Sequence, residues 1–186
     1  MLAGVLERLA RWSQREASLP RKLASLAAGS FFFLLLLPAL LTWLGVVVQI
    51  PPLAVAPLTA AFVVALGVVP GLFLLGWATL TQWRRGRGTP APMAPTQRLV
   101  VEGPYRLCRN PIELGAILYY LGFGTLLGSL GAGLLAALAA LVFGSAYHKL
   151  VEERELLARF GEDYRRYCKR TPFLIPSLGA FLNRRR

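Results

Sequence analysis

Charged side chains are scarce in this chain of 186 residues, and two long stretches contain none. Only 16% of the residues are charged, whereas 55% are hydrophobic, and charge is absent from Leu23 to Trp83 and from Leu114 to Tyr147. A bilayer crossing needs about 20 apolar residues, so stretches of this length exceed what a soluble core helix requires. The scarcity excludes a water-soluble globule and a disordered basic tail, and it predicts an integral membrane protein.

The few charges are mostly basic, which gives a net charge of +12. The 21 Lys and Arg residues form three clusters, before residue 23, between Arg84 and Arg109, and from Lys149 onward. If the apolar stretches cross the membrane in pairs, every cluster lies on one face, which the positive-inside rule makes cytoplasmic. The charge therefore reflects membrane topology. No basic face interleaves with aromatic residues away from the membrane, so we expect no nucleic-acid partner.

The apolar stretches predict an all-α integral membrane fold with about four transmembrane helices. The first stretch holds helices over about 23–48 and 58–83, and the second forms a short hairpin that turns near 128–131. Pro38 and Pro70 lie inside the first two spans and predict kinks, since neighbouring helices can satisfy the carbonyl groups that a proline leaves unbonded. The predicted segments are an N-terminal interfacial helix (1–22), a transmembrane hairpin (23–83), a cytoplasmic loop (84–111), a short transmembrane hairpin (112–147) and a C-terminal cytoplasmic amphipathic segment (148–186). Both termini are expected in the cytoplasm.

Cysteine and histidine are nearly absent. The two cysteines, Cys108 and Cys168, would both face the reducing cytoplasm, so we expect no disulfide. His148 is the only histidine, and the spacing of these three residues matches no metal-binding motif. We therefore expect no metal site.

Two cytoplasmic segments, one on each side of the short hairpin, hold most of the informative polar residues. In the first, Asn110, Pro111 and Glu113 have the spacing of a helix N-cap, a first-turn proline and a capping-box glutamate. Helix capping is one interpretation of Asn110 and Glu113, and contact with a bound molecule is the other. Arg106 and Arg109 suit either anionic lipid or an anionic group of a ligand.

The second segment predicts an amphipathic helix that begins near His148. A helical wheel places Glu153 in the middle of an apolar stripe, and the stripe consists of Leu150, Leu157, Phe160, Tyr164 and Cys168. A carboxylate on a buried face is costly without a partner, so Glu153 is either a functional residue or forms a structural salt bridge with Arg106 or Arg109. His148 is either a headgroup contact or a catalytic residue.

Aromatic residues accompany both segments. Tyr105, Tyr119, Tyr120 and Tyr147 lie near the membrane boundaries. Most of these four are expected to be interface-belt residues. Phe160 and Gly161, followed by Tyr164 and Tyr167, predict helix packing with an irregularity at the glycine.

Taken in order, these motifs resemble those of the isoprenylcysteine carboxyl methyltransferase family and, more loosely, those of the phospholipid methyltransferases. The family pattern is a Gly-x-Tyr turn, Arg-His-Pro with a later glycine, a short membrane hairpin, a Glu-Glu pair, Phe-Gly-x-x-Tyr-x-x-Tyr and a closing proline. The matching residues here are Gly103, Tyr105, Arg109, Pro111, Gly115, Glu152, Glu153, Phe160, Gly161, Tyr164, Tyr167 and Pro176. The resemblance covers roughly residues 97–176.

The resemblance implies a site for S-adenosylmethionine at the cytoplasmic face and methyl transfer to a hydrophobic acceptor that enters from the bilayer. By position, the residues expected to bind the cofactor are Gln97, Arg98, Leu99, Val100, Tyr105, Arg109, Asn110, Pro111, Ile112, Glu113, Glu152 and Glu153. The candidates for catalysis are His148 and Glu153. Membrane lipids and the acceptor are the expected partners.

Three positions depart from the family pattern, and they bear on the acceptor. Asn110 replaces a histidine, Glu113 replaces a tyrosine, and His148 replaces an arginine that orients the substrate. An arginine would clamp a substrate carboxylate, whereas a neutral histidine could accept a proton from a hydroxyl, thiol or amine. The acceptor stays open between a prenylcysteine-like or other lipidic molecule, a phospholipid amine, and a small molecule methylated on sulfur or oxygen. A non-catalytic scaffold or transporter is disfavoured, because the spans carry few polar groups.

Overall fold

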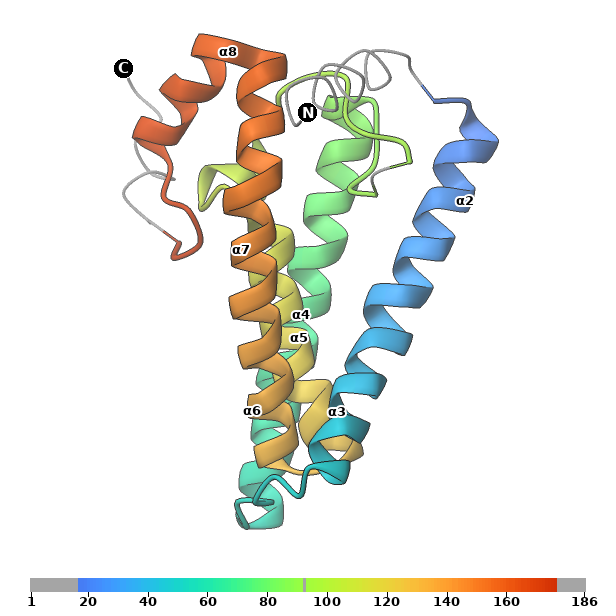
Figure 1. Ribbon diagram of the computed structural model, residues 1–186, viewed down its shortest axis with the longest axis vertical. Coiled ribbons are helices and arrows are strands. Elements are labelled where there is room, and N and C mark those ends of the chain that lie inside the picture. Colours follow the sequence, from blue (N-terminus) through green and yellow to red (C-terminus); the bar gives the residue numbers. More distant parts are fainter. Residues whose placement is uncertain (1–16, 92, 177–186) are drawn as a thin grey trace. The chain divides into compact units, whose positions relative to one another are not determined.

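A computed structural model describes residues 17–91 and 93–176, and the described residues form helices without a strand (Figure 1). The prediction of an all-α protein is confirmed. In chain order the elements are α2 (Leu19–Ser30), η1 (Phe31–Leu36), α3 (Leu37–Val47), α4 (Pro57–Thr81), η2 (Gln82–Gly86), η3 (Gly103–Arg106), α5 (Pro111–Leu127), α6 (Leu130–Ala139), η4 (Ala140–Gly144), α7 (Ser145–Tyr147), η5 (His148–Glu152) and α8 (Glu153–Arg170). Most of the predicted N-terminal interfacial helix falls on residues 1–16, outside the described residues.

Three of the described helices are long and apolar enough to cross a membrane: Leu19–Val47, Pro57–Gly86 and Leu130–Arg170. A fourth apolar helix, α5, is shorter, with 17 residues. The two spans expected over 23–48 and 58–83 are therefore present as helices, and the first arm of the second hairpin is short, as predicted. These helices make the chain an integral membrane protein.

The second arm of that hairpin does not end where its charge-free stretch ends. The helix that begins at Leu130 continues past Tyr147 through the π-helical turns η4 and η5 as far as a kink at Gly161, beyond which a further helical segment ends at Arg170 (Figure 1). Charge marks where the apolar part of a helix stops, but only a proline, a glycine or a cap ends the helix itself. The polar C-terminal helix is thus an extension of a helix that is long and apolar enough to cross a membrane.

By its internal contacts, the chain divides into two units. One, which we call the polar unit, comprises in its described part residues 17–28, 77–111 and 147–176, and the other, the apolar unit, comprises 29–76 and 112–146. Glu113 is the only Asp, Glu, Lys, Arg or His in the sequence of the apolar unit. The separation of charge that the sequence shows along the chain is therefore also a division of the fold.

Glycines allow α4 and α5 to approach closely within the apolar unit. A Cβ atom added to Gly67 would lie 2.7 Å from the backbone nitrogen of Gly122, and one added to Gly71 would lie 2.7 Å from that of Tyr119. A Cβ atom added to Gly122 would in turn lie 2.7 Å from the backbone nitrogen of Val68. Contact of backbone with backbone at a small-xxx-small spacing is the usual way in which membrane helices pack without a hydrophobic driving force.

Two tyrosine hydroxyls bond to backbone carbonyl groups that Pro38 leaves without an N–H partner. A proline at position 38 has no N–H for the carbonyl of Leu34, its α-helical partner, or of Phe33, its π-helical partner. The Tyr119 hydroxyl donates to the Leu34 carbonyl at 2.8 Å, and the Tyr120 hydroxyl donates to the Phe33 carbonyl at 2.7 Å. Both tyrosines are buried in the core of the apolar unit. Their expected role as interface-belt residues is therefore wrong, whereas the prediction that neighbouring helices satisfy the freed carbonyls is confirmed at Pro38.

Candidate functional site

The first wall of the site is formed where the helix α4–η2 ends and the chain folds back. The backbone N–H groups of Gln97 and Arg98 donate to the carbonyl of Gly86 at 2.6 and 3.3 Å, which fixes residues 96–100 beside η2. A Cβ atom on Gly86 would lie 2.9 Å from a methyl group of Val100, so this position has no room for a side chain. Gln82, one helical turn before Gly86, is thereby held next to Leu99 and Val100 in the same pocket.

The second wall is the turn that holds Tyr105. Gly103 begins this turn with a φ of +60°, and a Cβ atom there would lie 3.0 Å from the Thr81 hydroxyl oxygen. Left-handed backbone and close packing on α4 both favour glycine at this position. The Tyr167 hydroxyl donates to the backbone carbonyl of Tyr105 at 2.6 Å. Tyr105 is thus buried between the end of α4 and α8.

Helix α8 forms the third wall, and it bends at Gly161. This residue has φ +52° and ψ −124°, which are not helical values, so the predicted irregularity at the glycine is confirmed. Arg159 donates to the backbone carbonyl of Thr96, which attaches α8 to the first wall. Beyond the bend, Tyr164 and Tyr167 are buried.

The apolar stripe predicted for this helix is only partly buried. Tyr164 is buried, but the side chain of Leu150 is 60% exposed and that of Leu157 is 36% exposed. A wheel drawn at 100° per residue assumes a regular helix, whereas η5 is a π-helical turn and Gly161 breaks the helix. The stripe therefore loses its register before and after Glu153.

These walls enclose a pocket of about 460 Å³, a volume that includes its open mouth. The lining residues are Gln82, Thr96, Leu99, Val100, Tyr105, Arg109, Asn110, Glu152, Leu156, Phe160, Tyr164 and Tyr167. The pocket thus combines aliphatic and aromatic side chains with an amide, a carboxylate and a guanidinium group.

Several polar atoms on the pocket wall lack a partner within the described part of the chain. The Oε1 atom of Gln82, the hydroxyl of Tyr105 and Nε of Arg109 are buried, and none makes a hydrogen bond of good geometry. A buried polar group left unbonded costs about 1–3 kcal/mol, so native structures rarely keep several of them together. Their presence in one pocket indicates that the pocket takes a polar ligand or water.

Burial also changes the acidity of two groups in this region. The pKa of Tyr105 is raised well above its usual value, first by burial and then by the negative charge of Glu152, while a side-chain hydrogen-bonding interaction with Gln82 opposes the shift. Burial raises the pKa of Cys108 to about 11. Both groups therefore stay protonated at neutral pH, and Tyr105 is available as a hydrogen-bond donor.

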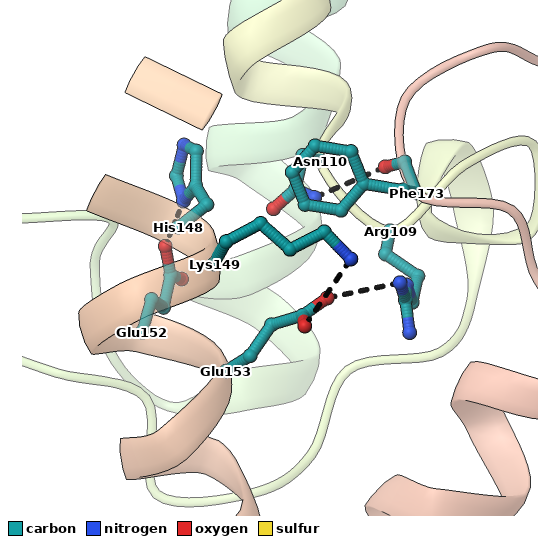
Figure 2. A network of polar contacts seen from close by, with 7 residues as sticks. All are labelled: Arg109, Asn110, His148, Lys149, Glu152, Glu153 and Phe173. Atoms are coloured by element: carbon teal, nitrogen blue, oxygen red, sulfur yellow. Dashed lines mark hydrogen bonds and ion pairs between the residues drawn. The ribbon is translucent and has the colours of Figure 1, made fainter. Parts of the chain in front are cut away.

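Beside the pocket, Glu153 takes part in a network of charged residues that Figure 2 shows. Its Oε1 atom lies 2.9 Å from Arg109, and its Oε2 atom lies 3.4 Å from Lys149. The Lys149 ammonium group lies over the ring of Phe173 at 4.3 Å. The salt bridge with Arg109 is one of the two interpretations that the sequence left open for Glu153. It positions the guanidinium group of Arg109 at the pocket wall.

His148 and Glu152 form a second pair on the same helix. Nδ1 of His148 contacts Oε2 of Glu152, one helical turn away (Figure 2). Glu152 lines the pocket, whereas His148 does not. His148 is thus connected to the pocket through the carboxylate, which can orient the imidazole ring.

Asn110 joins the pocket to the C-terminal segment. Its side-chain amide donates to the carbonyl of Phe173 at 3.0 Å (Figure 2). The backbone N–H of Arg109 donates to the carbonyl of Pro172 at 2.8 Å. Helix α5 begins at Pro111, directly after Asn110, and Glu113 lies in its first turn. The helix start predicted from this motif is confirmed, while the Asn110 amide has a further role in holding the segment around Phe173.

The structure brings about half of the predicted cofactor-binding residues to the pocket. The lining residues among them are Leu99, Val100, Tyr105, Arg109, Asn110 and Glu152. Gln97, Arg98, Pro111 and Glu153 belong to the same unit without lining the pocket, whereas Ile112 belongs to the apolar unit. Glu113 belongs to the apolar unit, where it is buried and its carboxylate lies against the Cα of Gly144.

Six lining residues were not predicted: Gln82, Thr96, Leu156, Phe160, Tyr164 and Tyr167. Four of them lie on α8, where the aromatic residues were assigned to helix packing. A signal for Leu156 was available, because it lies four residues after Glu152 and hence on the same helix face. Gln82 lies outside the motif-bearing segments, but it is the last uncharged polar residue before the basic cluster that starts at Arg84, a place where a membrane helix reaches the interface.

Among the described residues, no group of three or more His, Cys, Asp or Glu side chains is arranged to hold a metal ion. Cys108 and Cys168 are both free thiols. The polar side chains that line the pocket supply a carboxylate, a guanidinium group, amides and phenols.

Comparison with known proteins gives one family and two relatives, and each of them matches only a part of this chain. The cobalt-zinc-cadmium resistance protein CzcN of Cupriavidus metallidurans is 36% identical over 85 residues, which are 45% of this chain and 38% of that protein. The nickel-cobalt-cadmium resistance protein NccN of Alcaligenes xylosoxydans xylosoxydans is 34% identical over 84 residues, again 45% of this chain and 38% of that protein. The chain thus aligns with less than half the length of these curated relatives. No solved structure matches it.

The family match covers most of the residues that line the pocket. Residues 88–163 match the family described as phospholipid methyltransferase. This range includes the turn of Tyr105, the Arg109–Asn110 motif, the short hairpin and the Glu152–Glu153 pair, which are the motifs that carried the resemblance. Residues 88–163 are therefore similar to the phospholipid methyltransferase family, the family that includes the isoprenylcysteine carboxyl methyltransferases, and the predicted resemblance is confirmed over these residues.

Proposed function

We propose that this protein is a membrane methyltransferase that uses S-adenosylmethionine and methylates a hydrophobic acceptor at the cytoplasmic face. The observation that carries the proposal is the pocket of the polar unit, which has unbonded polar atoms on its wall and is built mostly from the segment with the family's sequence. The family match supports methyl transfer, and the three long apolar helices support a membrane site.

The chemistry of the pocket fits this cofactor part by part. Leu99, Leu156 and Phe160 offer an apolar surface for a flat base. The Glu152 carboxylate suits ribose hydroxyls or an ammonium group, and Arg109 suits a carboxylate. The unbonded Nε of Arg109 and hydroxyl of Tyr105 are donors that a polar ligand would satisfy. Neither a metal nor a covalent nucleophile on the protein is needed for this reaction.

Methyl transfer is a displacement in which a bond from the acceptor atom to the methyl carbon forms as the bond from sulfur to that carbon breaks. S-adenosylmethionine supplies the methyl group on a positively charged sulfur. The protein contributes by holding the two reactants in line and by excluding water. An acceptor with an O–H, S–H or protonated N–H group must also lose a proton, and His148, oriented by Glu152, is our candidate to receive it.

The acceptor should be hydrophobic, because the pocket belongs to a protein whose helices lie in the membrane. His148, in place of the family's arginine, favours an acceptor that releases a proton over one that is held through a carboxylate. This leaves a phospholipid amine and a small hydrophobic hydroxyl or thiol compound as the classes to compare. The printed names of the two relatives describe metal resistance of those proteins and assign no acceptor to this one.

The proposal is tested by incubating the purified protein, in lipid nanodiscs, with S-adenosylmethionine labelled in the methyl group and a lipid extract. We expect label in the organic phase. Glu152→Gln should reduce transfer by about 10- to 100-fold, as expected for loss of a hydrogen bond to a charged group. His148→Ala should reduce transfer by about 100-fold or more if His148 accepts a proton.

The matched control is Glu162→Gln, which removes a carboxylate from the same helix. Glu162 pairs with Arg165 at the surface and does not line the pocket, so transfer should be unchanged. Failure of the unmutated protein to bind the cofactor would contradict the proposal. Saturable binding without transfer to any lipid, amine, thiol or hydroxyl compound would instead favour a non-catalytic membrane protein.

A further inference from the structure

Gln82 and Tyr105 lie in the same pocket although they come from different elements. Gln82 begins η2 at the end of the α4 helix, and Tyr105 belongs to the η3 turn. The turn is fixed to that helix because Gly103 packs on Thr81 and Trp77, and it is fixed to α8 by the hydrogen bond from Tyr167. The packing that positions Gln82 and Tyr105 therefore does not involve the amide of Gln82 or the hydroxyl of Tyr105.

The Oε1 atom of Gln82 and the hydroxyl of Tyr105 are both buried, and the two side chains interact with each other without forming a hydrogen bond of good geometry. Tyr105 as a whole is only 6% exposed. Such groups call for an explanation in a native structure, and a ligand that pairs with them is the simplest one. The other amide on the wall differs, since the side-chain nitrogen of Asn110 is already bonded to the carbonyl of Phe173.

The two groups form an uncharged subsite with complementary donors and acceptors. A glutamine amide presents an acceptor oxygen and a donor nitrogen side by side, and this pair matches the amino group and the adjacent ring nitrogen of adenine. A tyrosine hydroxyl can complete such an edge as donor or acceptor. The charged residues of the wall, Arg109 and Glu152, suit the charged and hydroxylated parts of a nucleoside ligand instead.

We propose that Gln82, together with Tyr105, binds the amino edge of the cofactor's adenine and so selects adenine over other bases. This inference rests on the proposed function, because it assigns a part of the same cofactor. It adds a residue that lies outside the family-matched range of 88–163. The aliphatic and aromatic residues beside the subsite, Leu99, Leu156 and Phe160, would contact the faces of the same ring.

The test is calorimetric titration of the full-length protein in nanodiscs with two non-reactive ligands. One is S-adenosylhomocysteine, and the other is S-inosylhomocysteine, in which an oxygen replaces the amino group and the adjacent ring nitrogen carries a hydrogen. The unmutated protein should bind the adenosyl compound about 5- to 100-fold more tightly, the range expected for one bidentate contact to a base. Gln82→Leu should weaken binding of the adenosyl compound and reduce this preference to about twofold or less.

Tyr105→Phe is a second variant that keeps the buried ring and removes only the hydroxyl. It tests the same assignment if Gln82→Leu does not fold. It should lower the preference for the adenosyl compound by a smaller factor. Glu162→Gln should leave both affinities unchanged. Equal weakening of the two ligands by Gln82→Leu and Tyr105→Phe, or an unchanged preference, would overturn the assignment while the proposed function stands. Absence of binding of either ligand to the unmutated protein would overturn both.

Discussion

At the scale of single residues, two tyrosine hydroxyls replace backbone hydrogen bonds that Pro38 removes. We expect Tyr119→Phe to lower the free energy of unfolding by about 0.5–1.5 kcal/mol, as for other hydrogen bonds within membranes. In a Pro38→Ala background the restored N–H can bond to the freed carbonyls. Tyr119→Phe should therefore lower the free energy of unfolding by less in that background. Chemical unfolding of the four variants in detergent, analysed as a double-mutant cycle, measures this coupling. Additive effects of the two changes would show that the hydroxyl and the proline act independently.

Cys108 gives a prediction about pH. Burial raises the pKa of its thiol to about 11, whereas an unfolded cysteine ionises near pH 8.5. The folded state therefore keeps a proton that the unfolded state releases, so the contribution of Cys108 to stability is complete below about pH 8.5 and is lost as the pH rises towards 11. The stability of the unmutated protein should fall more steeply between these pH values than that of Cys108→Ala. Parallel curves for the two proteins would contradict the burial of this thiol.

Six of the residues that the sequence predicted to bind the cofactor line the pocket, but their partners were not predicted. Leu99, Val100, Tyr105, Arg109, Asn110 and Glu152 line the pocket, and the spacing of Asn110, Pro111 and Glu113 marked the true start of α5. The salt bridge between Glu153 and Arg109 was one of two interpretations, because a helical wheel shows which face a side chain occupies and not what lies opposite. The hydroxyls of Tyr119 and Tyr120 could not be assigned, since their partners lie 85 and 87 residues away along the chain.

At the scale of elements, the packing of α4 on α5 depends on glycines. Gly67→Ala would place a methyl group 2.7 Å from the backbone nitrogen of Gly122 and the carbonyl oxygen of Leu118. Because backbone atoms cannot move aside as a flexible side chain can, we expect a loss of about 1–3 kcal/mol in the free energy of unfolding. Gly76→Ala is the matched control on the same helix, because nothing lies within 4 Å of a Cβ at that position. Its stability should be unchanged or slightly increased.

Equal stability of Gly67→Ala and Gly76→Ala would show that α4 and α5 are not in backbone contact. The spacing of Gly67 and Gly71 was visible in the sequence and is the signal that could have predicted this contact. The irregular turns were harder to foresee. The π-helical turns η4 and η5 interrupt a run of residues with ordinary helix propensity, and only Gly161 marked a break in advance.

At the scale of the whole molecule, the distribution of charge predicts that both polar loops and both termini face the cytoplasm. In a variant without Cys108 and Cys168, Ala54→Cys lies between the first two spans, and Met93→Cys lies in the loop after the second. A membrane-impermeant maleimide should label Ala54→Cys in intact cells and Met93→Cys only after permeabilisation. Both side chains are exposed, so burial would not prevent labelling. Labelling of both positions from the same side would contradict the topology.

The membrane fold was predictable because long stretches without charge have few alternatives to helices that span a bilayer. The pocket was predicted less completely, since Gln82, Leu156 and Phe160 line it from a part of the chain that includes the irregular turns η2 and η5 and the bend at Gly161. Such bends follow from packing between segments that are far apart in sequence. The motifs thus predicted the charged and polar residues of the pocket, whereas its full set of lining residues became known only from the fold.

The central claim is that the pocket of the polar unit binds S-adenosylmethionine, and the most direct test is ultraviolet cross-linking of the labelled cofactor to the purified protein. We expect saturable labelling that excess S-adenosylhomocysteine prevents, with the label in peptides that contain residues 96–110 or 152–167. Glu152→Gln should decrease the labelling and Glu162→Gln should not. Labelling that is unsaturable, or that maps only to the apolar unit, would contradict the account.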